Sequence, residues 1–391
     1  MSLIENRLLE ITNILRKCNT TDAGLFTGNS GIGLFLAHVN QHYMEDVLMD
    51  EAGRAFRKSF DALEQGGPLH SFAEGYAGVC WALNHLVQQN LVEADINSLF
   101  EEIDPYLISA AENDLEHTYL DYLHGGLGAA IYFIDRLAEA AAFKHISTCI
   151  DFLFQQAVVS GNEIRWHSLI QNGEPGKITE FNLGLSHGIP GIICFLSKCY
   201  TKQIQAERCL FLINGAVSWI LKQKLPAGSV SKFPSSMDGS GHFRHSRLGW
   251  CYGDLGIAAC IWQAAKALNN ESWKMEAVEI MLHASRRKEL LENGIRDAGI
   301  CHGTAGIAHL FNRFYLETGM SIFKETSNHW IRESLKMPLH DGGLAGYQSF
   351  YAESGWVNEY GLLNGVAGIG LVLLSQITEK APSWDSCLLL S

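Results

Sequence analysis

The sequence predicts an all-α protein whose helices form an α/α toroid, a double α barrel of seven inner and seven outer helices. Three observations lead to this fold class. A Gly-x-x-Gly pattern recurs seven times, each copy heads a mostly apolar run, and amphipathic segments separate these runs. An open row of inner helices would expose one flat apolar side, so we expect the seven inner helices to close into a ring.

The size and composition of the chain suit one large closed domain over residues 1–391. Apolar residues make up 47% of the chain, and the formal net charge is -13. This charge argues against a nucleic-acid partner, because no continuous phosphate-binding surface is available. The N-terminus has no signal-peptide pattern and no apolar run reaches the length of a transmembrane segment. We therefore expect a cytoplasmic protein with reduced thiols, attached to membranes only through a biosynthetic complex.

The seven glycine pairs mark the starts of the inner helices. The two glycines of a pair lie one turn apart on the same helix face, which lets helix ends crowd together at one mouth of the ring. The pairs are Gly28/Gly31, Gly75/Gly78, Gly125/Gly128, Gly188/Gly191, Gly253/Gly256, Gly303/Gly306 and Gly365/Gly368.

The runs after the glycines are apolar on nearly all sides, as in helices that are covered on both faces. Examples are Gly31–Val39, Gly78–Val87, Gly128–Leu137 and Gly368–Leu374. The amphipathic segments between them predict outer helices. They cover about 4–18, 45–64, 93–112, 138–158, 204–223, 271–290 and 320–336.

Two segments interrupt the repeat, at residues 166–183 and 224–247. Both contain Gly and Pro, and both lead directly into motifs rich in polar residues. Long loops in compact domains are usually functional or disordered, and their position here favours function. Strand-like alternation is expected only in short pieces of 224–247.

Residues with ligand or acid–base chemistry accumulate just before the first glycine of the consecutive fourth, fifth and sixth repeats. These pairs are Ser186-His187, Cys251-Tyr252 and Cys301-His302. Because equivalent positions in neighbouring repeats lie at the same end of the ring, we expect the three pairs to converge there.

Cys251, Cys301 and His302 predict a zinc site. Two thiolates and one imidazole are ligand types that zinc prefers, and three protein ligands leave a fourth position open, as in catalytic sites. Such a site suits the formation of a sulfur nucleophile, because the metal lowers the pKa of an incoming thiol. The alternative is two core cysteines and a helix-capping histidine.

Four further residues are candidates for the chemistry. His187 titrates in the range that proton transfer near neutral pH requires, and Asp121 is placed to orient His187 or a substrate amide. Arg247 would hold a substrate carbonyl or balance a developing enolate, and Tyr252 would donate a hydrogen bond near the metal. The alternatives are a structural histidine, a solvated loop arginine and a core tyrosine. His124 is a spare candidate.

The loop histidines His242 and His245 are either alternative metal ligands or exposed residues.

At these residues the chain resembles the lanthionine synthetase C-like family, the stand-alone lantibiotic cyclases. The motifs that carry the resemblance are Ser-His-Gly-Ile-Pro-Gly at 186–191, Trp-Cys-Tyr-Gly-Asp-Leu-Gly at 250–256 and Cys-His-Gly-Thr-Ala-Gly at 301–306. The resemblance extends over essentially the whole chain and implies a double α barrel. It also implies that Cys251, Cys301 and His302 are the zinc ligands. The active-site positions that it implies are His187, Asp121, Arg247 and Tyr252.

The resemblance further implies a reaction and its partners. A peptide cysteine, held as thiolate, adds to the β-carbon of a dehydroalanine or dehydrobutyrine, and protonation of the resulting enolate completes a (methyl)lanthionine thioether ring. His187 is the expected proton donor. The repeats occupy the chain, so a separate dehydratase would act first on the precursor peptide. An export transporter is a further expected partner.

Three other functions stay open on the sequence alone. The first is another zinc α/α-barrel transferase, such as a prenyltransferase-like enzyme, whose zinc ligands would include an Asp. The second is a non-cyclising relative that binds glutathione or adds thiols to dehydrated residues. The third is a metal-free interaction protein. Zinc content, thiol loss from a dehydrated peptide and binding of a lipid diphosphate would separate them.

Overall fold

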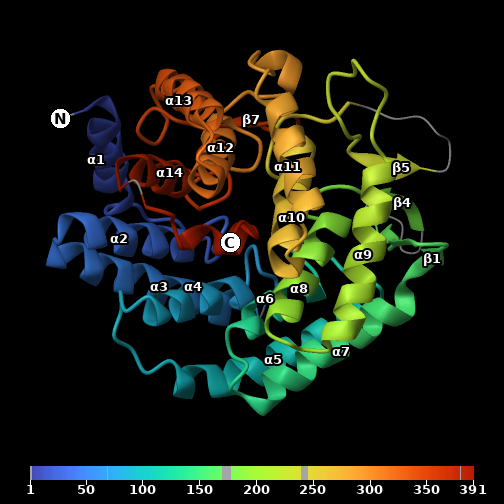
Figure 1. Cartoon of the computed structure of the whole chain (residues 1–391). Coiled ribbons are helices and arrows are strands. Elements are labelled where there is room, and N and C mark those ends of the chain that lie inside the picture. The colour runs from blue at the N-terminus through green and yellow to red at the C-terminus, as the bar shows by residue number, and fades with distance from the viewer. Residues whose placement is uncertain (1, 68, 170–177, 239–244, 379) are drawn as a thin grey trace. The chain divides into compact units, whose positions relative to one another are not determined.

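The computed structural model describes residues 2–67, 69–169, 178–238, 245–378 and 380–391, and helices dominate it (Figure 1). The chain divides into two compact units. One consists of Met1–Leu107 and Leu290–Trp384, and the other of Ile108–Glu289 and Asp385–Ser391. The boundary falls within helix α5 (Asn97–Glu116), which begins in the first unit and ends in the second.

The first unit contains four helices that are apolar and almost wholly buried over most of their length. They are α2 (Asn29–Tyr43), α4 (Tyr76–Gln88), α12 (Thr304–Thr318) and α14 (Val366–Thr378). Amphipathic helices cover them, namely α1 (Leu3–Leu15), α3 (Asp46–Gly66) and α13 (Ser321–Lys336). Helix α2 packs on α3, α12 on α13, and α14 on α1, while α14 also contacts both α2 and α12 (Figure 1).

The first unit also carries short elements between its helices. A one-turn helix, η1 (Leu291–Asn293), precedes α12. A hairpin of β6 (Ser349–Tyr351) and β7 (Gly355–Val357) lies in the chain between α13 and α14. The short helix η2 (Trp384–Leu388) follows α14 and continues into the second unit.

The second unit repeats the same inner and outer pattern. Its inner helices are α6 (Gly126–Ile134), α8 (Ile189–Thr201) and α10 (Asp254–Leu268). Its outer helices are α7 (Ala140–Gln156), α9 (Ala206–Lys222) and α11 (Glu271–Ala284). Each inner helix packs on the outer helix that follows it, and α8 contacts both α6 and α10.

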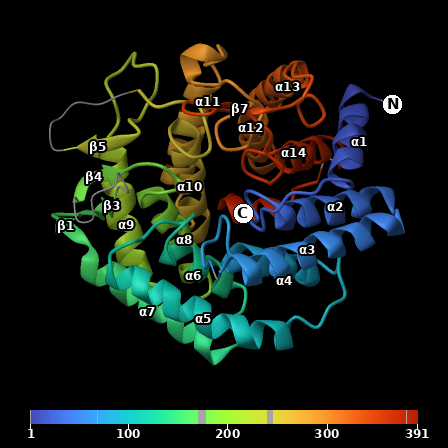
Figure 2. The ribbon, with the colours of Figure 1, turned by 180° about the vertical axis from the view of Figure 1, so that it is seen from behind.

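Two small sheets accompany these helices. Strands β1 (Val158–Ser160) and β2 (Glu163–Arg165) form an antiparallel hairpin, and β2 packs on α9. Strand β4 (Ile178–Asn182) pairs with β3 (Ser168–Leu169) and β5 (Ser236–Asp238) in a three-stranded antiparallel sheet. Figure 2 shows these strands from behind, on the side of the unit where α9 lies.

The glycine pairs have a local structural cause. In the pairs from Gly28 to Gly303 the first glycine is the N-cap of its inner helix. The second glycine lies in the first turn, where a Cβ would collide with the turn that leads into the helix. At Gly256 that Cβ would lie 2.5 Å from the Trp250 carbonyl oxygen, and at Gly306 it would lie 1.8 Å from that of Ile300. At these two glycines the close contact is therefore with the preceding turn of the same repeat, rather than only between neighbouring helix ends as the sequence suggested.

The predicted helices agree with the structure in number and order. Within the described residues there are fourteen α-helices. Two expectations need correction. The third inner run was predicted to reach Leu137, but α6 ends at Ile134. Strands were expected only within 224–247, where β5 does lie, yet the other strands lie outside that loop. Strands of two to five residues are too short to display a clear alternation of polar and apolar residues.

Candidate active site

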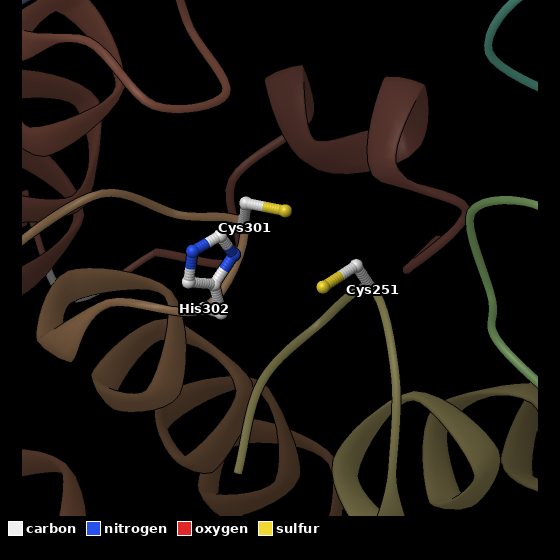
Figure 3. A group of neighbouring side chains, drawn as sticks. All are labelled: Cys251, Cys301 and His302. Atoms are coloured by element: carbon white, nitrogen blue, oxygen red, sulfur yellow. The ribbon is translucent and has the colours of Figure 1, made fainter. Parts of the chain in front are cut away.

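The three side chains predicted as zinc ligands form one group in the structure. Cys251 precedes α10 in the chain, and Cys301 and His302 precede α12. The sulfur and ring-nitrogen atoms of the three side chains all lie within 4.8 Å of one another. Figure 3 shows both sulfurs and the imidazole directed toward one another. Cys251 is buried, whereas Cys301 and His302 are half-buried.

This donor set fits a zinc ion. Zn–S bonds of about 2.3 Å and Zn–N bonds of about 2.0–2.1 Å in a tetrahedron place donor atoms roughly 3.5–3.8 Å apart. The three donors lie within 4.8 Å of one another, an upper limit about 1 Å above these values. The partial exposure of Cys301 and His302 leaves a side from which a fourth ligand can enter.

Backbone hydrogen bonds hold the turn that carries Cys301 and His302. The N–H groups of Ile300 and Cys301 both donate to the Leu363 carbonyl oxygen, at 2.8 and 3.0 Å. Within the same turn, the Asp297 carboxylate accepts the Gly299 N–H at 3.0 Å. The position of Cys301 is thus fixed by the backbone of its own unit.

The turn that carries Cys251 is tied to the turn that carries His187. The Cys251 carbonyl oxygen accepts the Leu185 N–H at 2.8 Å and the Ser186 hydroxyl at 3.4 Å. Trp250, directly before Cys251, is fully buried, and its indole N–H donates to the Leu388 carbonyl oxygen at 2.8 Å. These contacts lie within the second unit, and they hold the turn that carries Cys251 against the turn that carries His187.

His187 and Asp121 form a charge-assisted pair. His187 Nδ1 lies 2.5 Å from Asp121 Oδ2. The other carboxylate oxygen accepts the N–H groups of Leu123 and His124 at 2.7 and 2.8 Å, so the carboxylate cannot rotate away. Burial alone would lower the pKa of His187, but the hydrogen bond and charge of Asp121, together with the charge of Cys251, outweigh burial and raise that pKa. Asp121 therefore favours a protonated His187.

Two aromatic rings flank His187. The His124 imidazole is stacked on it, with ring centroids 5.9 Å apart and planes 16° from parallel. The Tyr252 ring centroid lies 6.2 Å away. The predicted residues Asp121, His124, His187 and Tyr252 therefore gather around one imidazole.

Of the other predicted polar residues, the structure describes Arg247 and His245. The Arg247 side chain is exposed, and its guanidinium makes no hydrogen bond or ion pair within the described part of the chain. His245 is also exposed, and His242 lies outside the described residues. The structure therefore does not bring Arg247 into contact with the His187 group.

A buried ion pair that sequence reasoning missed holds the loop before Cys251. Asp254 is fully buried, and its carboxylate accepts the N–H groups of Lys232 and Phe233 at 2.9 and 3.0 Å. Arg287 donates to Asp254 at 3.2 Å and to the Ser246 carbonyl oxygen at 2.8 Å. The pair therefore holds the backbone at Lys232 and Phe233 together with that at Ser246, next to Arg247. An Asp at the first position of a helix is itself common, so its spacing did not indicate this role.

The chain is similar to known proteins over almost its whole length. The family model described as lanthionine synthetase C-like protein matches residues 19–389. A relative, the nisin biosynthesis protein NisC of Lactococcus lactis subsp. lactis, is 26% identical over 395 residues, which cover 94% of this chain and 88% of the relative. A solved structure of a nisin cyclase matches with a TM-score of 0.77 at 20% identity, covering 99% of this chain and 96% of that one.

The likeness to the solved structure shows the fold, an α/α toroid, and confirms the fold class predicted from the sequence. No helix in the described part of the chain has the length and apolarity that a membrane-spanning helix requires.

Proposed function

The chain belongs to the lanthionine synthetase C-like family, and we propose that it is a zinc-dependent lanthipeptide cyclase. Residues 1–391 would act as one catalytic domain. The reaction is the addition of peptide Cys thiolates to dehydroalanine or dehydrobutyrine, which forms (methyl)lanthionine rings. The observation that carries this proposal is the donor set of Cys251, Cys301 and His302, whose ligand atoms lie within 4.8 Å of one another.

Cys251, Cys301 and His302 would hold the zinc ion. When bound, zinc lowers the pKa of a substrate thiol and stabilises its thiolate. The chain supplies the proton chemistry. The peptide thiol first gives up its proton, and as the C–S bond forms at the β-carbon, the π bond between the α- and β-carbons breaks and negative charge moves to the neighbouring carbonyl oxygen. The α-carbon then takes up one proton, so the ring closes without a net change in mass.

His187 is the proposed donor of that proton. Its pairing with Asp121 at 2.5 Å and its raised pKa favour the protonated ring that a general acid requires. Tyr252 is the proposed hydrogen-bond donor to the oxygen on which charge develops. Arg247 has an exposed guanidinium and would reach the same oxygen only from the solvent side, when substrate is bound.

The proposed partner is a dehydrated precursor peptide. The name of the relative NisC places that protein in nisin biosynthesis, which supports a peptide substrate for this chain. A separate dehydratase would supply the substrate, and an export transporter would take the product. The location that this proposal requires is the cytoplasm, where thiols stay reduced.

The test is incubation of the zinc-loaded chain with a dehydrated precursor peptide, followed by alkylation of the remaining thiols. We expect peptide thiols to disappear while the peptide mass before alkylation stays constant. The same peptide with its Ser and Thr residues intact is the control and should keep its thiols. Persistence of all thiols in the dehydrated peptide would refute the cyclase, and a mass gain in the presence of glutathione would favour the thiol-adding alternative.

Gly184→Ala should lower the rate of thiol loss by about 100-fold, since a displacement of about 1 Å near the chemistry can have that effect. A Cβ at this position would lie 2.7 Å from a ring carbon of Tyr252 and 2.8 Å from the Cys251 carbonyl oxygen. Both groups would have to move. The measurement is kcat/KM for thiol loss.

Gly53→Ala is the matched control for this variant. Gly53 lies inside α3, and a Cβ there would meet no atom nearer than 3.6 Å. This control should keep full activity and gain up to about 1 kcal/mol in the free energy of unfolding. Full activity of Gly184→Ala would mean that the Tyr252 ring does not need its present position.

A further inference from the structure

Asn182 is the last residue of β4 and contacts Tyr252 from the neighbouring repeat. Its side-chain nitrogen Nδ2 lies 3.0 Å from the Tyr252 hydroxyl oxygen. The sequence did not single out Asn182, and the contact joins residues that are 70 positions apart.

The amide of Asn182 has only one consistent orientation. Its other terminal atom lies 2.7 Å from the Gly184 backbone nitrogen, whose N–H can only donate. That atom must therefore be the carbonyl oxygen Oδ1, and the atom that faces Tyr252 must be the NH2 group. Because the NH2 group can only donate, the Tyr252 oxygen accepts this hydrogen bond.

The direction of this bond decides where the tyrosine proton points. A phenol has one hydrogen, and a hydroxyl oxygen that accepts from Asn182 must direct its own O–H elsewhere. The Tyr252 ring is held closely beside Gly184, since a Cβ on this glycine would lie 2.7 Å from a ring carbon and does not fit. The backbone bond from Leu185 N–H to the Cys251 carbonyl oxygen holds the neighbouring residue as well.

We propose that Asn182 is a positioning residue that fixes the Tyr252 hydroxyl as a hydrogen-bond donor to the carbonyl oxygen of the unsaturated substrate residue. The inference rests on the proposed function and deepens it. Charge develops on that oxygen as the thiolate adds, so a donor already oriented toward it stabilises the transition state more than the ground state. The ligand class that this site recognises is an α,β-unsaturated peptide carbonyl.

The chain itself indicates how to reverse the bond without disturbing the turn. Two aspartates accept the N–H two residues later in the same way as Asn182, namely Asp121 at 2.7 Å and Asp297 at 3.0 Å. An aspartate therefore suits this kind of turn. Asn182→Asp keeps the acceptor for Gly184, but it replaces the NH2 donor with a second acceptor. The Tyr252 hydroxyl would then donate to the new carboxylate and lose its orientation toward substrate.

The experiment compares four proteins in the thiol-loss assay: the wild type, Asn182→Asp, Tyr252→Phe and the double variant. Each single variant should lower kcat by about 100-fold, the typical effect of removing one such donor, with KM nearly unchanged. The double variant should be no slower than Tyr252→Phe, because both changes remove the same interaction. Zinc content and thermal midpoint should equal those of the wild type.

The remaining outcomes overturn the inference. They are wild-type kcat in Asn182→Asp, wild-type kcat in Tyr252→Phe, and a further 100-fold loss when Asn182→Asp is added to Tyr252→Phe. If Asn182→Asp loses zinc or does not fold, Asn182→Ser takes its place, because the Ser hydroxyl can still cap the turn. Wild-type kcat in a folded Asn182→Ser would then overturn the inference. A wild-type protein that consumes no thiols would instead refute the cyclase itself.

Discussion

Cys301→Ala should weaken zinc binding by roughly 100-fold and suppress ring formation while leaving the fold intact. Four-ligand zinc sites hold their ion by about 10–16 kcal/mol. One ligand of comparable strength then contributes about 3 kcal/mol, or roughly 100-fold in affinity. Cys301 is one of the three proposed ligands and is only half-buried, so its removal should weaken the metal site more than the core. The measurements are zinc per chain after dialysis and thiol loss from a dehydrated peptide.

Cys18→Ala is the matched control for Cys301→Ala. Cys18 is also a half-exposed cysteine of the first unit, and it lies just beyond α1. This variant should keep stoichiometric zinc and full activity. If Cys301→Ala binds zinc as tightly as the wild type and closes rings at the same rate, Cys301 is not a ligand and the catalytic proposal fails.

His187→Ala should retain zinc and lose most ring formation. Removal of a positioned general acid typically costs about 10²–10⁴-fold in rate, and His187 is the imidazole that Asp121 holds at 2.5 Å. The measurement is kcat for thiol loss together with zinc content. His117→Ala, which removes an exposed imidazole next to α5, should leave both unchanged. Wild-type kcat in His187→Ala would show that another group supplies the proton.

Asp121→Asn removes the negative charge of Asp121 but keeps the size of the side chain. The amide oxygen can still accept the N–H groups of Leu123 and His124, so the turn should persist. The pKa of His187, which Asp121 now raises against the effect of burial, should fall. Because His187 must be protonated to donate, the alkaline limb of the pH–rate profile should move to lower pH. An unchanged profile would exclude protonated His187 as the acid.

Much of the fold could be predicted because one local rule repeats along the chain. The inner helices from α2 to α12 have a glycine at the N-cap, and a second glycine in the first turn avoids a collision with the preceding turn, as Gly253 and Gly256 illustrate. Such a rule leaves a pattern that can be counted in the sequence. The β6–β7 hairpin leaves no comparable pattern, because each strand has three residues and pairs with residues only eight or fewer positions away.

The candidate site could be predicted in part for the same reason. Cys251 and Cys301 occupy equivalent places before a first glycine, so their ligand chemistry and the repeat register together predicted the site. Asn182 was missed because its role depends on a hydrogen bond to Tyr252, which sequence spacing does not encode. A weak signal did exist, since Asn182 precedes the first glycine of its pair by the same interval as Asp297.

X-ray absorption at the zinc edge of the purified wild-type chain would reveal the ligands of the proposed metal site. We expect one zinc ion with two sulfur neighbours at about 2.3 Å and nitrogen or oxygen neighbours at about 2.0–2.1 Å. The sulfur count should fall from two to one in Cys251→Ala. A shell without sulfur, or a wild-type spectrum in that variant, would contradict a zinc site built from Cys251, Cys301 and His302.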